Sequence, residues 1–92
     1  MIISVELFGI ARSRAGVSEW DQSFADEANV TLETVLRELV REFPQLEGEC
    51  IANGGLTAAF VVNLNGARFV RDRDTRLKDG DCLLLLSADA GG

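Results

Sequence analysis

Apolar and polar residues alternate near the start of the chain. Apolar side chains stand at every second position from Ile3 to Leu7, and this period of two predicts a β-strand over about residues 2–8. Residues 9–16 begin and end with glycine, which predicts a connection with room for one helical turn. Alternation resumes over residues 17–24, so we expect a second strand that pairs back on the first.

From residue 31 the apolar residues follow the period of an α-helix instead. They recur at the spacing i, i+3, i+4, i+7, i+8 and i+11, at Leu32, Val35, Leu36, Leu39, Val40 and Phe43. Thr31 can accept a hydrogen bond from a first-turn amide and so cap the helix, and Pro44 cannot continue it. We therefore expect one helix that ends near residue 43, with one apolar stripe that a sheet must cover.

The remaining apolar runs predict three more strands. Residues 58–64 alternate, Asn65-Gly66 is the strongest short-range signal for a two-residue hairpin turn, and residues 67–71 form the returning strand. Residues 82–86 are a cysteine and four leucines without alternation, as expected for a strand in the middle of a sheet. Residues 45–57 carry no such pattern and are expected to form a loop.

The order strand, strand, helix, strand, strand, strand predicts a single α+β domain over residues 1–92. The helix packs on one face of a mixed sheet of about five strands, and the last strand lies in the middle, parallel to the first. This arrangement is the β-grasp, the ubiquitin-like fold.

The net charge of −6 is concentrated in the middle of the chain. Residues 1–18 carry one acid and two bases, residues 19–49 nine acids and two bases, and residues 50–92 five of each. An acidic segment argues against nucleic-acid binding and is explained by solvation or by a basic protein partner. No apolar run is long enough to span a bilayer, and the N-terminus lacks a signal peptide's features, so we expect a cytoplasmic protein without membrane contact.

Residue content excludes several kinds of site. The chain has no histidine, so a His-dependent triad or His-ligated zinc is impossible, and it has neither common glycine-rich phosphate-binding motif. Asp72-Arg73-Asp74 begins like a calcium loop, but Arg76 stands at the third ligand position and Leu77 replaces the required glycine. We expect this chain to bind no metal and no cofactor.

The two cysteines, Cys50 and Cys82, are 32 residues apart. A disulfide or half of a metal site is possible. Two unpaired thiols are favoured in a cytoplasmic chain, with Cys82 packed in a core strand.

The segment after the last strand holds the remaining candidate for reactivity. Residues 88–92 are small and end in Gly91-Gly92, and if extended they reach about 16–18 Å, so we expect a flexible tail that fits a narrow channel. Glycine has no Cβ, which lets another enzyme approach the terminal carbonyl closely. The Gly92 carboxylate becomes an acyl donor only after activation, most simply by adenylation. Attack by sulfur then gives a thiocarboxylate, and attack by a lysine amine gives an isopeptide bond.

Over essentially its whole length the chain resembles the MoaD/ThiS family of ubiquitin-like sulfur carriers. The resemblance is carried by Phe8 at the end of the first strand, Asn65-Gly66 at the hairpin, Leu-Lys-Asp-Gly-Asp at residues 77–81, and Gly91-Gly92. It implies a β-grasp fold, activation of Gly92 by an adenylating enzyme similar to the ubiquitin-activating type, and loading by a sulfurtransferase. ATP, magnesium and any zinc would then belong to the partner enzyme.

Within the family, the extra segment at residues 45–57 makes the chain look closest to the longer, MoaD-like members. This likeness implies the small subunit of molybdopterin synthase, whose tail enters the large subunit and delivers sulfur in molybdenum cofactor biosynthesis. The implied partner interface consists of Phe8, Leu86, Ser87, Ala88, Asp89 and Ala90. MoaD-like tails commonly carry a proline before the glycines, and residues 85–90 have none, so the pathway stays open.

Three alternatives to the molybdopterin pathway therefore remain. The chain could carry sulfur for another pathway, such as thiamin, cysteine or tRNA thiolation. It could be a protein modifier conjugated to lysines through Gly92. It could also be a non-covalent interaction domain whose glycine ending has no role.

Overall fold

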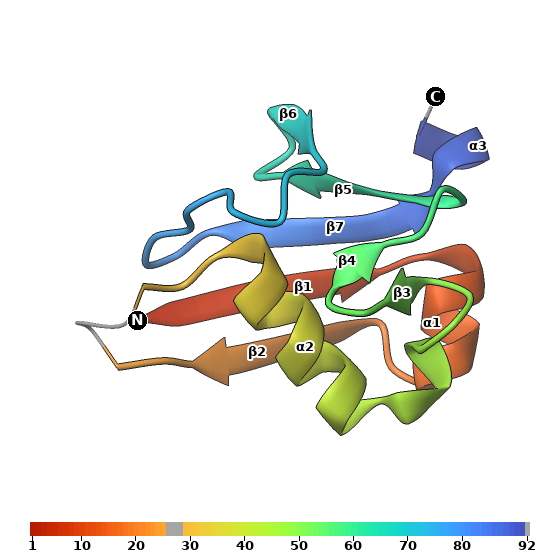
Figure 1. The fold of residues 1–92 in the computed structure, drawn as a ribbon, viewed down its shortest axis with the longest axis horizontal. Coiled ribbons are helices and arrows are strands. Elements are labelled where there is room, and N and C mark those ends of the chain that lie inside the picture. The colour runs from red at the N-terminus through yellow and green to blue at the C-terminus, as the bar shows by residue number, and fades with distance from the viewer. Residues whose placement is uncertain (26–28, 92) are drawn as a thin grey trace.

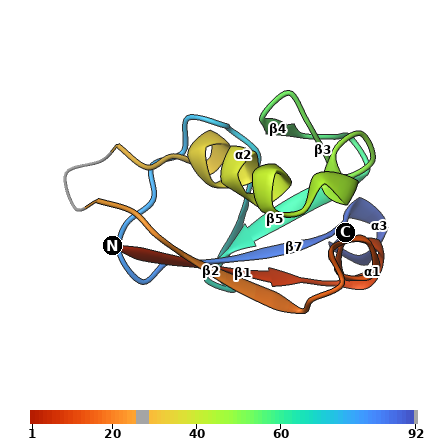
Figure 2. The same ribbon diagram turned by 90° about the horizontal axis from the view of Figure 1, so that it is seen from below.

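The computed structural model describes residues 1–25 and 29–91. They form two layers, a five-stranded sheet and one long helix, α2 (Leu32–Glu42), which lies across one face of the sheet (Figures 1 and 2). Within the described part of the chain no helix lies across the opposite face, which we call the open face.

The sheet has its last strand in the middle. Its strands are β1 (Ile2–Leu7), β2 (Glu19–Ser23), β5 (Phe60–Leu64), β6 (Arg68–Val70) and β7 (Cys82–Ser87), in the order β2-β1-β7-β5-β6. β7 runs parallel to β1 and antiparallel to β5, as Figure 1 shows. The predicted strands, the hairpin at residues 65–66 and the central placement of the last strand are confirmed.

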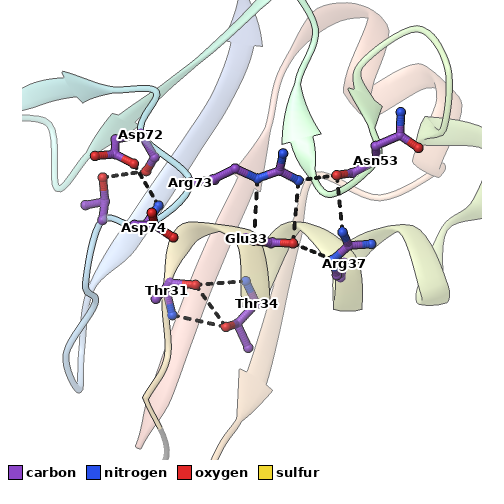
Figure 3. Close-up of polar contacts among 9 residues, drawn as sticks. Thr31, Glu33, Thr34, Arg37, Asn53, Asp72, Arg73 and Asp74 are labelled. Atoms are coloured by element: carbon purple, nitrogen blue, oxygen red, sulfur yellow. Dashed lines mark hydrogen bonds and ion pairs between the residues drawn. The ribbon is translucent and has the colours of Figure 1, made fainter.

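Helix α2 begins and packs as its sequence predicts. The Thr31 hydroxyl accepts a hydrogen bond from the Thr34 amide at 3.3 Å, and the Thr34 hydroxyl accepts one from the Thr31 amide at 3.2 Å (Figure 3). The apolar stripe is buried at Leu32, Val35, Leu36 and Leu39. These side chains join a core that includes the helix-facing residues of the three middle strands, among them Val5, Val62, Leu83 and Leu85.

Charged and backbone contacts join α2 to two other segments (Figure 3). The Glu33 carboxylate accepts a hydrogen bond from Arg37 at 2.8 Å and pairs with Arg73 at 3.4 Å, and both guanidinium groups donate to the Asn53 carbonyl. The hydrogen bond from Arg37 lowers the pKa of Glu33 below its usual value, and the charge of Arg73 adds to this effect. The loop after β6 and the turn at Asn53 are thereby fixed to the first half of α2.

The connection expected at residues 9–16 is a helix of seven residues, α1 (Gly9–Ala15). It lies at the end of the sheet where β1 finishes (Figure 2). Ala11 is buried, and Gly16 ends the helix in the left-handed conformation, with a φ of 80°, which glycine adopts without strain. The sequence had suggested a single turn, because the run is short and polar and has a glycine at each end.

The segment at residues 45–57 is more regular than the loop that we expected. It contains part of the 3-10 helix η1 (Pro44–Leu46) and a hairpin of β3 (Ile51–Ala52) and β4 (Gly55–Leu56). The hairpin turns at residues 53 and 54, which have φ values of 53° and 76°. The Asn-Gly pair that predicted the turn at residues 65–66 is present here too, so the sequence contained this signal.

A buried carboxylate fixes the start of β7. Asp81 is only 5% exposed; one of its oxygens accepts from the Asn65 side chain at 3.0 Å and the other from the Lys78 amide at 2.9 Å. The side-chain amide oxygen of Asn65, Oδ1, in turn accepts from the Cys82 backbone amide at 2.7 Å. These contacts connect the β5–β6 turn to β7, so several residues that carry the family resemblance set the register of the central strand.

We predict that Asp81→Ala lowers the free energy of unfolding by about 2–4 kcal/mol, because it leaves buried donors without partners. Asp79→Ala is the comparison variant for the loss of unfolding free energy. The Asp79 carboxylate accepts from the Ile2 amide at 2.8 Å in an exposed position, so Asp79→Ala is expected to cost about 1 kcal/mol or less. Urea unfolding followed by circular dichroism measures both values. Equal losses for the two variants would show that burial of Asp81 does not matter.

Candidate functional site

The candidate site begins where β7 leaves the sheet. Ser87 is the last residue of β7 and pairs with Phe60. The Ala88 amide then donates to the Ala59 carbonyl at 2.8 Å. This is the last hydrogen bond described between the tail and the sheet. The predicted reactive residue, Gly92, lies outside the described residues.

Residues 88–91 do not have the extended form that the reach of about 16–18 Å assumed for the predicted flexible tail. These residues form a helical turn, α3 (Ala88–Gly91), at the edge of the molecule beside the start of β5 (Figure 1). Two of the four are alanine, the best helix former, and none is proline. A helix of four residues rises about 6 Å, whereas the same residues extended reach about 13 Å. Entry of this segment into a narrow channel therefore requires the turn to unwind.

Five apolar side chains gather on the open face next to the tail. We call them the apolar patch: Phe8, Val61, Phe69, Leu84 and Leu86. Because Leu83 and Leu85 point into the core, alternation places Leu84 and Leu86 on the open face. In the sheet register Val61 is opposite Leu86, and Asn63 lies between Leu84 and Phe69. Phe69 is 52% exposed and Phe8 is 45% exposed.

The residues predicted to form the partner interface lie together at this end of the sheet. The Phe8 amide donates to the Leu85 carbonyl at 3.1 Å, which places Phe8 beside the end of β7. Leu86, Ser87 and Ala88 are half-buried and Asp89 is exposed. Ala90 and Gly91 belong to the backbone of α3, and nothing is described of the Ala90 side chain.

Sequence reasoning missed three members of the patch, Val61, Phe69 and Leu84. The signal was present, because each is an apolar residue at a position that alternation assigns to the face away from the helix. The unpatterned run of leucines concealed it. Four apolar residues in a row suggested burial on both sides, whereas the burial of β7 in fact alternates.

Beside the patch, the open face is acidic. Glu6 lies opposite both Leu84 on β7 and Glu19 on β2, and Asp21 lies opposite Ser4. We call Glu6, Glu19 and Asp21 the acidic flank. The open face thus changes from acidic at β2 and β1 to apolar at β7, β5 and β6. The excess of acids noted at residues 19–49 is in part concentrated here.

Cys82 lies in the central strand, as expected, but its side chain is half-buried on the open face and is not packed in the core. Its Sγ is 3.9 Å from a carboxylate oxygen of Glu6. Partial burial raises the pKa of the thiol, and the negative charges of the acidic flank raise it further. Cys82 is five positions before Ser87, about 16 Å along the strand, so the thiol is remote from the tail.

Cys50 is the fully buried cysteine, and burial with the adjacent Glu49 charge raises its pKa to about 11. Both cysteines are free, which confirms the prediction of two unpaired thiols. Thiolate is the reactive form of cysteine, so the raised pKa values make both thiols weaker nucleophiles at neutral pH than an ordinary cysteine.

The described residues were also searched for other kinds of site. No three His, Cys, Asp or Glu side chains among them gather in a way that could hold a metal ion. Over the same part of the chain, no helix has the length and apolar content needed to cross a membrane.

The topology and the tail together define a class of protein. A mixed sheet that holds its last strand at the centre, crossed on one face by a single long helix and continued by a small-residue tail, is the β-grasp of ubiquitin-like carriers. The family model described as the ThiS family matches residues 5–92. The chain belongs to this family of ubiquitin-like sulfur carriers, which confirms the resemblance drawn from the sequence.

Similar solved structures include carriers of different kinds. The Pyrococcus furiosus protein assigned as molybdopterin converting factor subunit 1 is 25% identical, with a TM-score of 0.71 over 95% of this chain and 97% of that one. Small archaeal modifier protein 1 of Methanosarcina acetivorans is also 25% identical, with a TM-score of 0.73 over 99% of this chain and 96% of that one. A complex of subunits 1 and 2 of molybdopterin-converting factor from Helicobacter pylori contains a chain that is 24% identical, with a TM-score of 0.63 and full coverage of both chains. A search of curated proteins found no match.

We predict that both thiols of the folded protein react slowly with iodoacetamide at pH 7.5, because their raised pKa values leave little thiolate. Cys50 is expected to stay unmodified until the protein unfolds. Glu6→Gln removes one negative charge beside Cys82, so it should lower the pKa of Cys82 and speed its alkylation about two- to threefold. Mass spectrometry of each cysteine peptide measures the rates.

The matched control for this experiment is Glu49→Gln, which removes a charge beside Cys50 instead. It should leave the rate at Cys82 unchanged. An equal acceleration of Cys82 by both variants would mean that the acidic flank does not control this thiol.

Proposed function

We propose that this chain carries sulfur on its C-terminal residue, Gly92. A partner enzyme similar to the ubiquitin-activating type adenylates the Gly92 carboxylate, and a sulfurtransferase supplies the sulfur. The product is a thiocarboxylate that is passed to an acceptor in the cytoplasm. ATP and magnesium are used by the partner, and this chain holds no cofactor of its own.

The chemistry keeps the carbon at the oxidation level of an acid. A carboxylate oxygen of Gly92 attacks the α-phosphorus of ATP and pyrophosphate leaves. A sulfur nucleophile at the oxidation level of sulfide then attacks the acyl carbon, the bond to AMP breaks, and the sulfur remains on the carbon. The body of this chain supplies no group to either step. Its part is to dock and to present the tail.

One observation carries this proposal: in a chain of the ThiS family, the central strand runs directly into the tail, beside an exposed apolar patch. A partner that takes the tail into its active site must cover the adjoining surface. Phe8, Phe69 and Leu86 are suited to such a contact, because exposed aromatic and aliphatic side chains that gather in one patch mark protein interfaces.

We further propose that the sulfur acceptor is the precursor of molybdopterin and that the chain is the small subunit of molybdopterin synthase. The likeness to the Pyrococcus furiosus subunit 1 supports this assignment, because it extends over nearly the full length of both chains. The Helicobacter pylori factor is a complex of subunits 1 and 2. By analogy, the tail of this chain would insert into a large subunit.

Sulfur carriage predicts a defined change in mass. After incubation with ATP, magnesium, a cognate adenylating enzyme and a sulfur donor, the intact protein should gain about 16 Da, the exchange of one oxygen for sulfur at the activated carboxylate. Omission of ATP and deletion of Gly92 are the two controls, and each should abolish the gain. With an enzyme shown to be active on another carrier, an unchanged mass would argue strongly against the proposal.

The apolar patch predicts a matched pair of docking variants. Phe69→Asp places a charge in the patch and should raise the KM of the adenylating enzyme for the carrier about tenfold or more, with little effect on kcat. Ile2→Asp is the control. Ile2 is 51% exposed and lies on the open face, but about 20 Å along the strand from Phe8.

Ile2→Asp is expected to leave KM within about twofold of the unmodified carrier. Steady-state kinetics of ATP-dependent pyrophosphate release gives both constants. Similar KM values for the two variants would place the contact elsewhere on the molecule.

A second candidate function is covalent modification of other proteins. The likeness to the modifier protein of Methanosarcina acetivorans favours it, because the identity equals that of the molybdopterin factor and the coverage is similar. The adenylated Gly92 would be attacked by a lysine amine in place of sulfur. Diglycine remnants on lysines of other cellular proteins after proteolysis would support this function. Their absence under both sulfur-limited and stressed growth would exclude it.

A further inference from the structure

The start of β5 lacks a strand on one side. Carbonyl groups alternate in direction along a strand. The Ala59 carbonyl faces the tail, where it accepts from Ala88, so the Phe60 carbonyl faces the opposite side, toward β6. β6 is too short to reach it, since its last residue, Val70, pairs with Val62. A side chain must satisfy the Phe60 carbonyl in place of a strand.

Arg71, the residue after β6, does this with its guanidinium group. One terminal nitrogen donates to the Phe60 carbonyl at 2.7 Å. The other donates to the Thr57 carbonyl at 3.0 Å and to the Leu56 carbonyl at 3.4 Å. The planar guanidinium donates from two separate nitrogens in a fixed geometry, whereas the three donors of a lysine ammonium share one nitrogen.

The hydrogen bonds described for the Arg71 guanidinium all go to backbone carbonyls. None of the ion pairs between described residues includes it, although Asp72 follows it directly in the chain. Its three acceptors are at the end of β4, in the connection to β5 and at the start of β5, and this connection passes below α3 in Figure 1. Thr57 also bonds to the backbone of Glu49 and Cys50, and the Phe60 amide donates to the Thr57 carbonyl at 3.3 Å.

Ala59 lies between the carbonyls that Arg71 holds. The Thr57 and Phe60 carbonyls are both fixed by the guanidinium, so the chain between them has little freedom, and the Ala59 carbonyl is directed at the Ala88 amide. The Ala88 bond is where the tail leaves the sheet. The Arg71 guanidinium therefore acts through Ala59 on the point where the tail leaves the sheet.

We propose that Arg71 is a positioning residue for the tail: by holding residues 56–60 it fixes the acceptor of the Ala88 amide, and so the direction in which residues 88–92 leave the sheet. Its part in sulfur loading rests on the proposed function. Its part in holding Ala88 does not.

Amide hydrogen exchange of the free protein, followed by NMR, tests the inference. Arg71→Gln removes the guanidinium group and should speed amide hydrogen exchange at Ala88 about tenfold. Exchange at Phe8, whose amide donates to Leu85 in the neighbouring strand pair, should not change. Arg71→Lys keeps the charge but offers a single donor group, so about threefold is expected at Ala88.

Arg73→Gln is the matched control. Arg73 also donates to a backbone carbonyl, that of Asn53, and pairs with Glu33, but these partners belong to the α2 network of Figure 3. The rate of amide exchange at Ala88 in Arg73→Gln should equal that of the unmodified protein. Unchanged exchange at Ala88 in Arg71→Gln overturns the inference. So does equal acceleration by Arg73→Gln, or acceleration at Phe8 as great as at Ala88.

Kinetics with the adenylating enzyme separates positioning from general stability. If fewer molecules present the tail in the competent direction, Arg71→Gln should raise KM about three- to tenfold and leave kcat nearly constant. If Arg71→Gln speeds amide exchange at Ala88 but leaves KM unchanged, Arg71 has no role in sulfur loading. If the unmodified protein forms no thiocarboxylate, the proposed function fails, while the exchange result still decides whether Arg71 holds the tail exit.

Discussion

The structure depends on the central place of its last strand. β7 is paired on both sides, with β1 in parallel and with β5 antiparallel, and its leucines at positions 83 and 85 meet the helix stripe in the core. The buried Asp81 carboxylate fixes where this strand begins. Everything placed at its other end, the tail and the apolar patch, takes its position from that pairing.

Most of the fold could be predicted from the sequence, because the signals for most of its elements come from residues that are close together along the chain. The helix stripe, the Thr31 cap and the Asn65-Gly66 turn each depend on neighbours a few residues away. The prediction failed at the hairpin of β3 and β4, where the Asn53-Gly54 signal was present but the two strands have only two residues each. The turn at Asn53 is fixed by Arg37 and Arg73 from other segments, and no short-range pattern contains those partners.

The site could be predicted in part. Phe8 and Leu86, which the sequence predicted as interface residues, lie near the tail, but Phe69 comes to the same patch only through the register of β5 with β6 and β7. The tail's helical turn was missed because small residues are compatible with both shapes. Arg71 was not considered at all: its importance arises from the shortness of β6, which leaves a carbonyl uncovered.

The pairing of β1 with β7 also governs how the chain folds. Ser4 and Cys82 are partners although 78 residues separate them, so the two ends must meet before the sheet is whole. Such distant closure is slow, and rates in the millisecond-to-second range are typical of folds rich in non-local pairs. Until β7 docks, β1 and β5 each present an unpaired edge beside exposed apolar side chains. Those edges, and not the finished carrier, are the point at which this chain is vulnerable to aggregation.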